Sequence, residues 1–126
     1  MKQQTLTKSE MQVMNILWDL NRGACVNDIL AQYPDPKPAY TTIATFLKIL
    51  TQKGFVEHKK GSSGKLLIYS PLITKEKYRR QVMEEVKDDF FGNSFKSMFS
   101  FFVREEHLTA EEIQELIDQI KEEEKI

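Results

Sequence analysis

Residues 38–54, PAYTTIATFLKILTQKG, decide the fold. We predict one helix here, because Pro38 suits a first turn and Gly54 suits the left-handed position after the last turn. At about 100° per residue, the face that can be buried holds Ala39, Ile43, Phe46, Leu47 and Leu50. The opposite face lacks carboxylates and holds Thr41, Ala44, Thr45, Lys48 and Gln52. Such a face suits a helix that lies against phosphates and base edges, although an ordinary surface helix is the alternative.

The sequence before this helix predicts two more. Thr7 and Glu10 form a capping box for a helix that runs to about Leu20. Its buried stripe holds Met11, Met14, Leu17 and Trp18. A very short strand over 24–26 and a helix over 27–33 follow. Residues 34–38, PDPKP, are too rich in proline for either element and predict a rigid connector.

The sequence after Gly54 changes to a period of two and predicts a β-hairpin. Its strands cover 55–60 and 65–70, with GSSG at 61–64 as the loop and Pro71 ending the second strand. Three helices followed by a hairpin make a winged helix, a variant of helix-turn-helix. The tip of the hairpin is flanked by Lys59, Lys60 and Lys65, where a DNA backbone would pass. A solvated hairpin end is the alternative for these lysines.

Residues 74–126 predict three helices, over 74–91, over 94–104 and after a second capping box at Thr109 and Glu112. About 50 residues rarely bury enough apolar surface to be stable alone. We therefore expect burial against a second copy, in a homodimer. The expected interface comprises Tyr78, Val82, Val86, Phe90, Phe95, Met98, Phe99, Phe102, Ile113, Leu116, Ile117 and Ile120. A phenylalanine-lined ligand pocket is the competing interpretation.

The overall fold class is thus mainly α with a small β-hairpin. We expect a winged-helix DNA-binding domain at 1–73 and a helical dimerisation domain at 74–126. The charge follows this division: the first part holds 9 Lys/Arg against 5 Asp/Glu, and the second 9 against 14. DNA binding by the first part, with the acidic part kept away from phosphates, fits this asymmetry.

Composition excludes several classes of protein. No apolar run approaches the roughly 20 residues that span a bilayer, and the N-terminus lacks the apolar segment of a signal peptide. A single cysteine forms no internal disulfide. We expect a cytoplasmic protein with no direct membrane insertion. His58 and His107 lack partners at metal-ligand spacing, and no catalytic constellation or phosphate-binding loop occurs. We therefore expect no metal, no cofactor and no enzymatic activity.

Three stretches together form a longer pattern: LTKSEMQVMNILW at 6–18, VNDILAQY at 26–33 and AYTTIATFLKILTQKGFVEHKK from residue 39. With GKLLIYSPL at 64–72 and the later SFFVREEHLTAEEIQEL, they resemble the penicillinase-repressor (BlaI/MecI/CopY-type) family of bacterial winged-helix transcriptional regulators. The similarity covers nearly the whole chain and is strongest over 6–71.

The resemblance implies a dimeric repressor that binds a palindromic double-stranded DNA operator. Thr42 and Thr45 match the family's pattern as DNA-contacting residues. We add Tyr40, Thr41, Lys48 and the three hairpin lysines as contacts with bases or phosphates. The resemblance also implies release by cleavage in the middle dimerisation helix, by a membrane sensor protease or a protease it activates. The matching bond is Phe101–Phe102.

The chain departs from the family in three places. Where the family has Asn–Phe at the cleaved bond, this chain has Phe101–Phe102. Where characterised members carry basic residues in the recognition helix, it has Thr41, Ala44 and Ile49. The cysteine pairs of CopY-type members are missing from its C-terminal residues. The alternative function is a winged-helix protein-interaction module without sequence-specific DNA binding, and the salt dependence of DNA binding distinguishes the two.

Overall fold

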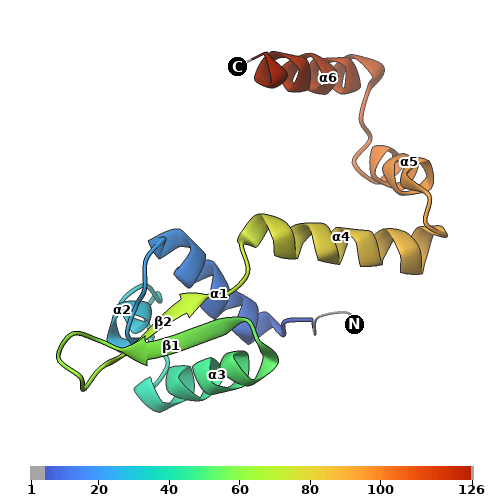
Figure 1. Cartoon of the computed structure of the whole chain (residues 1–126). Helices are drawn as coiled ribbons and strands as arrows, with labels where there is room; N and C mark the ends of the chain where they lie inside the picture. Colours follow the sequence, from blue (N-terminus) through green and yellow to red (C-terminus); the bar gives the residue numbers. More distant parts are fainter. Residues whose placement is uncertain (1–4, 126) are drawn as a thin grey trace. The chain divides into compact units, whose positions relative to one another are not determined.

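The computed structural model describes residues 5–125 and divides into two compact units, Met1–Gln81 and Val82–Ile126 (Figure 1). The division falls inside one continuous helix, α4 (Lys75–Phe91). Helix α4 therefore contributes to both units, and the hairpin belongs to the first.

The first unit is a bundle of three helices followed by an antiparallel hairpin. Its elements are α1 (Lys8–Leu20), α2 (Val26–Leu30), α3 (Tyr40–Lys53), β1 (Val56–Lys60) and β2 (Leu67–Pro71). The strands pair from Val56 opposite Pro71 to Lys60 opposite Leu67. Helix α3 contacts α1, α2 and β1, and β2 joins the unit through β1 and α1. The predicted winged-helix fold is confirmed.

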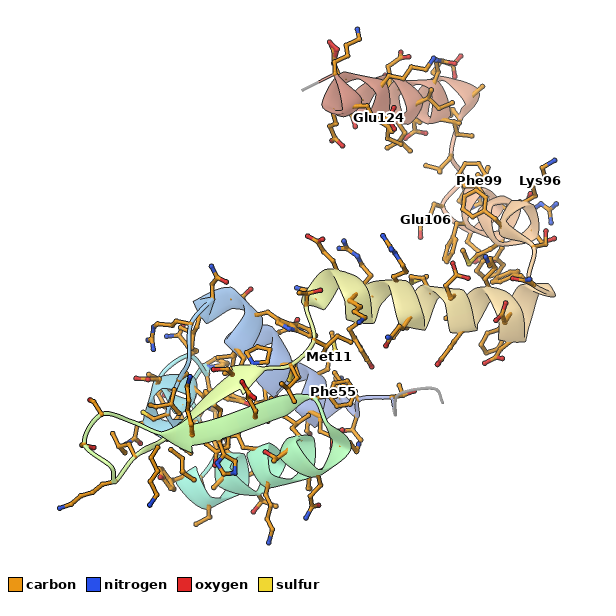
Figure 2. All side chains as sticks on the ribbon, viewed as in Figure 1. Met11, Phe55, Lys96, Phe99, Glu106 and Glu124 are labelled. Atoms are coloured by element: carbon orange, nitrogen blue, oxygen red, sulfur yellow. The ribbon has the colours of Figure 1, made fainter. Side chains whose placement is uncertain are left out.

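The core of the first unit lies between α3, α1 and the hairpin. Its fully buried large side chains are Val13, Met14, Leu17, Ile29, Ile43, Leu47, Leu50, Phe55 and Val56. Phe55, labelled in Figure 2, directly follows α3 and its C-cap. Burial of each of the larger apolar side chains contributes roughly 1.5–3 kcal/mol relative to exposure. The predicted apolar stripe of α3 is confirmed at Ile43, Leu47 and Leu50, whereas Phe46 is only half-buried.

Both ends of α3 show how its sequence sets its length. Gly54 is the C-cap, with φ of 85°, as predicted. The start differs: Ala39 is the N-cap and Pro38 precedes it, so the prediction that Pro38 stands in the first turn was wrong by two residues. Ala39 has an extended backbone, with ψ of 149°, and is exposed instead of lying on the buried face.

The segment around α2 is shorter than predicted. The expected strand over 24–26 is a single bridge, in which Ala24 exchanges two backbone hydrogen bonds with Tyr69, at 2.9 and 2.8 Å. Helix α2 ends at Leu30 instead of Tyr33. The Lys37 ammonium donates to the carbonyls of Leu30, Ala31 and Tyr33 just after the helix, and the Leu30 carbonyl also accepts from the Tyr33 N–H.

The hairpin has a longer loop than predicted. Strand β2 begins at Leu67, and the connection closes through a hydrogen bond from Gly61 N–H to the Leu66 carbonyl, at 2.7 Å. Pro71 belongs to the strand and pairs opposite Val56 at its end. A proline is tolerated at the end of a strand because only one ladder hydrogen bond is lost there.

The first turns of α4 belong to the first unit through Tyr78, which is only 6% exposed. Its hydroxyl accepts a hydrogen bond from the Leu6 N–H at 2.9 Å, and its ring packs edge-on against Phe55. The predicted boundary, between residues 73 and 74, precedes the observed division for this reason. Tyr78, expected at a dimer interface, instead lies in the core of the winged helix.

The second unit contains the rest of α4, α5 (Phe95–Glu105) and α6 (Ala110–Glu124). The capping box of Thr109 and Glu112 is present as predicted, and Ser94 is the N-cap of α5. Positive φ angles at Gly92 and Asn93, 57° and 61°, separate α4 from α5. No side chain among residues 82–125 is buried. In the described part of the chain, no helix is both long and apolar enough to cross a membrane.

Candidate nucleic-acid interface

The exposed face of α3 carries the residues predicted to contact DNA. Tyr40, Thr41, Thr42, Thr45 and Lys48 are all exposed, as is Gln52 further along the helix. The helix contains no Asp or Glu from its first residue to its last. A DNA phosphate approaching this face meets hydroxyls and an ammonium group and no carboxylate to repel it.

The threonines of this face differ in what they offer to a base. The Thr45 hydroxyl donates to the Thr41 carbonyl at 2.9 Å, as an i−4 bond within the helix. It therefore presents its oxygen as an acceptor and its methyl group as an apolar contact. Thr41 and Thr42 make no side-chain hydrogen bond within residues 5–125 and can donate outward. The sequence did not reveal this difference. A threonine inside a helix, beyond its first turn, can always donate to the carbonyl four residues earlier, but the sequence does not say whether it does.

The three lysines of the hairpin are exposed but do not share one face. Lys59 lies opposite Ile68, and Lys60 lies opposite Leu67. Successive residues of a strand point to opposite faces, and directly opposed residues share a face. Lys60 therefore lies on the same face as Leu67 and Tyr69, and Lys59 lies on the other. Lys65 stands in the loop before β2.

The lysines of this surface differ from Lys53 in their partners. Within residues 5–125, neither Lys48 nor the three hairpin lysines form an ion pair. Lys53, in the last turn of α3, bonds instead to the Glu10 carboxylate at 2.7 Å. Burial works to raise the pKa of Glu10, but hydrogen bonds from Lys53 and Thr7, with the charge of Lys53, hold that pKa below its ordinary value. Lys53 thus links α3 to α1, and the other four lysines remain available to phosphates.

A notch that the sequence did not predict lies between the hairpin and the start of α3. Its volume is about 260 Å³, and it is lined by residues of α2, α3 and the hairpin. From α3 and the hairpin come Tyr40, Ala44, Lys65, Leu66, Leu67 and Tyr69. No sequence period could have identified the notch, because it needs three elements to meet.

The second unit presents most of its apolar side chains to solvent. Among the predicted dimer residues, the exposed ones are Phe90, Phe95, Phe99, Phe102, Leu116, Ile117 and Ile120. Val82, Val86, Met98 and Ile113 are half-buried. Within the unit, Phe95 stacks on Phe99 with ring centroids 5.9 Å apart. Phe99 lies on α5 and is labelled in Figure 2. The Phe101–Phe102 bond lies inside α5, and both rings are exposed.

Comparison with known proteins finds relatives that cover both units of the chain. The family model described as "Penicillinase repressor" matches residues 6–122. The methicillin resistance regulatory protein MecI of Staphylococcus aureus (strain N315) is 29% identical over 112 residues, covering 88% of this chain and 89% of MecI. The penicillinase repressor of Bacillus licheniformis is 28% identical over 118 residues, covering 93% and 90%.

A solved structure shares the fold of part of this chain. It is the solution structure of monomeric B. licheniformis BlaI in complex with the blaP half-operator, at a TM-score of 0.50 and 24% identity. The match covers 61% of this chain and 92% of the BlaI chain. The family model covers both the winged helix and the helices that follow it. The chain belongs to the penicillinase-repressor family.

Proposed function

We propose that this protein is a transcriptional repressor that binds a palindromic operator as a homodimer. The observation that carries the proposal is the exposed, carboxylate-free face of α3 beside a hairpin with three exposed lysines. Membership of the penicillinase-repressor family supports it. So does the fold shared with BlaI, a repressor solved with a half-operator.

The contacts divide by chemistry into two groups. In the major groove, Thr41, Thr42 and Thr45 meet base edges, with Thr45 as acceptor and the other two as donors. Lys48 and the Tyr40 hydroxyl bind phosphates beside them. From the hairpin, Lys59, Lys60 and Lys65 bind the sugar–phosphate backbone, which positions the protein without selecting a sequence.

The second unit supplies the dimer. Its exposed phenylalanines and α6 residues have no partner within residues 82–125 that removes them from water. A second copy of the same surface would bury them in an interface with twofold symmetry, which matches the symmetry of a palindromic operator. The proposed surface comprises Val82, Val86, Phe90, Phe95, Met98, Phe99, Phe102, Ile113, Leu116, Ile117 and Ile120. Tyr78 is left out because the winged helix already buries it.

We also propose that cleavage of the Phe101–Phe102 bond releases the repressor. Cleavage there would separate Phe102 and all of α6 from the rest of the dimer surface. The proposed partner for this cleavage is a membrane-bound sensor protease, or a protease that this sensor activates. Mass spectrometry of the chain after co-expression with such a sensor tests this, and a fragment beginning at Phe102 is expected. An intact chain under conditions that relieve repression contradicts it. Phe101→Asn, which restores the family's residue, should increase cleavage.

Selection of bound fragments from a random DNA pool, followed by a salt titration, tests DNA binding. A palindromic site should emerge, with half-sites about one helical turn or a small multiple apart. Each lysine–phosphate contact adds about 0.9 to the slope of log affinity against log salt. If all four free lysines of both protomers engage, the slope approaches about −7. No selected sequence and no salt-dependent binding would instead favour the protein-interaction module.

A further inference from the structure

Exposed apolar side chains of the winged helix gather at one place. Within residues 5–81, the large apolar side chains that remain exposed are Tyr40, Leu66, Leu67 and Leu72. The first three line the notch between hairpin and α3, and Leu72 does not. An isolated exposed leucine needs no explanation, but three such side chains around one hollow mark a contact surface.

The notch combines this apolar lining with donors at its edge. Lys65, Asn27 and the Tyr40 hydroxyl can donate hydrogen bonds there, and none of its lining residues is acidic. Burial raises the pKa of Tyr69, and the neighbouring Tyr40 adds to the rise, so the Tyr69 phenol stays protonated. An apolar surface beside a cation and neutral donors matches a sugar joined to a phosphate.

The size and place of the notch favour part of a polymer over a free small molecule. Pockets for drug-sized ligands usually measure about 300–1,000 Å³, and the notch holds about 260 Å³. It is also continuous with the face of α3 proposed to lie in the major groove, because Tyr40 and Ala44 belong to both.

We infer that the notch seats one deoxyribose–phosphate unit of the operator backbone. Leu66 and Leu67 contact the sugar, and Lys65 with the Tyr40 hydroxyl binds the phosphate. This inference rests on the proposed DNA-binding function and adds to it an apolar contribution to affinity. Because the two leucines would pack against one sugar, binding should be sensitive to a hydroxyl group added at the 2′ position of that sugar.

The salt dependence of binding separates the leucines from the lysine. Apolar contacts release no counterions, whereas a lysine–phosphate contact does. Operator affinity of the full chain is measured from about 50 to 200 mM salt. We expect Leu66→Ala and Leu67→Ala each to weaken binding about threefold to tenfold at every salt concentration, with an unchanged slope. Lys65→Ala removes one phosphate contact from each protomer and should reduce the slope by about 1.8. Leu72→Ala, also exposed but outside the notch, is the matched control and should bind as the unchanged chain does.

A ribonucleotide scan of the operator tests the seat itself. One deoxyribose at a time is replaced by ribose, and the affinity of the unchanged chain is compared with that of the Leu66→Ala/Leu67→Ala double variant. We expect one position per half-site where the added 2′-hydroxyl weakens the unchanged chain several-fold and the double variant much less. Coupling of this kind requires that the leucines meet that sugar.

Two outcomes would overturn the inference while leaving the proposed repressor intact. One is normal operator affinity in both leucine variants, which would make the notch a surface for a protein partner or for no partner. The other is a ribose effect that is equal in the unchanged chain and the double variant. Failure of the unchanged chain to bind any DNA would contradict the proposed function itself, so the two failures are distinguishable.

Discussion

The two units of this chain differ in where their apolar side chains go. In the first, nine large side chains are fully removed from water within a single copy. In the second, no side chain of residues 82–125 is buried, and Phe90 remains 77% exposed. The helices of the second unit are nonetheless well capped. The difference teaches that local helix signals and a core are separate requirements, and that the second unit meets only the first within one copy.

The largest effect is expected from disrupting the proposed dimer interface of the second unit. Phe99→Glu places a charge in the proposed interface, where desolvation without a partner charge is costly. We expect a monomer by analytical ultracentrifugation and loss of operator binding, because a single winged helix lacks the avidity of two. Lys96→Glu, on the exposed surface of the same helix, is the matched control and should remain dimeric. A dimeric Phe99→Glu variant would contradict the interface.

The next effect concerns the first unit, whose core needs no partner. Leu47→Ala leaves a cavity at a fully buried position and should lower the free energy of unfolding by about 2–5 kcal/mol. Urea denaturation followed by the fluorescence of Trp18 measures this, since Trp18 lies on α1 of the same unit. Lys48→Ala, one residue further along, should change stability by less than about 0.5 kcal/mol. Dimer dissociation should be unchanged in both variants.

A smaller effect concerns the ion pair that ties α3 to α1. The folded-state pKa of Glu10 lies below its ordinary value of 4.5. Its carboxylate therefore stabilises the fold above the unfolded pKa, and this contribution is lost as the pH falls through the folded pKa. Glu10→Gln should cost about 1–3 kcal/mol at neutral pH, with the difference from the unchanged chain closing in acid. Urea titrations at several pH values measure it, and Glu57→Gln, exposed on β1, is the control.

The smallest expected effect is a difference in the salt dependence of DNA binding between lysines on the two faces of the hairpin. Lys60 shares the face of Leu67 and the notch, whereas Lys59 lies on the other face. We expect Lys60→Ala, which removes one contact from each protomer, to reduce the salt slope by about 1.8, and Lys59→Ala to reduce it less. Both should weaken operator and random DNA alike, because phosphate contacts carry no sequence information. A change of preferred sequence in either variant would contradict the backbone role.

Much of the first unit could be predicted because its signals are local. The capping box of Thr7 and Glu10, the left-handed Gly54 and the change of period after it place the elements within a few residues. Two of the errors occurred where distant contacts decide. Ala24 forms only a bridge to Tyr69, and Tyr78 turns inward because Leu6 and Phe55 meet it there.

For the candidate interface, the sequence determined which residues lie on the exposed face of α3, since helical periodicity alone fixes that face. It also determined that the second unit carries more apolar surface than its short helices can bury. Only the tertiary structure decided that Lys53 binds Glu10, that Lys59 and Lys60 lie on opposite faces, and that Tyr40 meets Leu66 and Leu67 at a notch. Each depends on which segments meet in space, and no local period along the chain records those meetings.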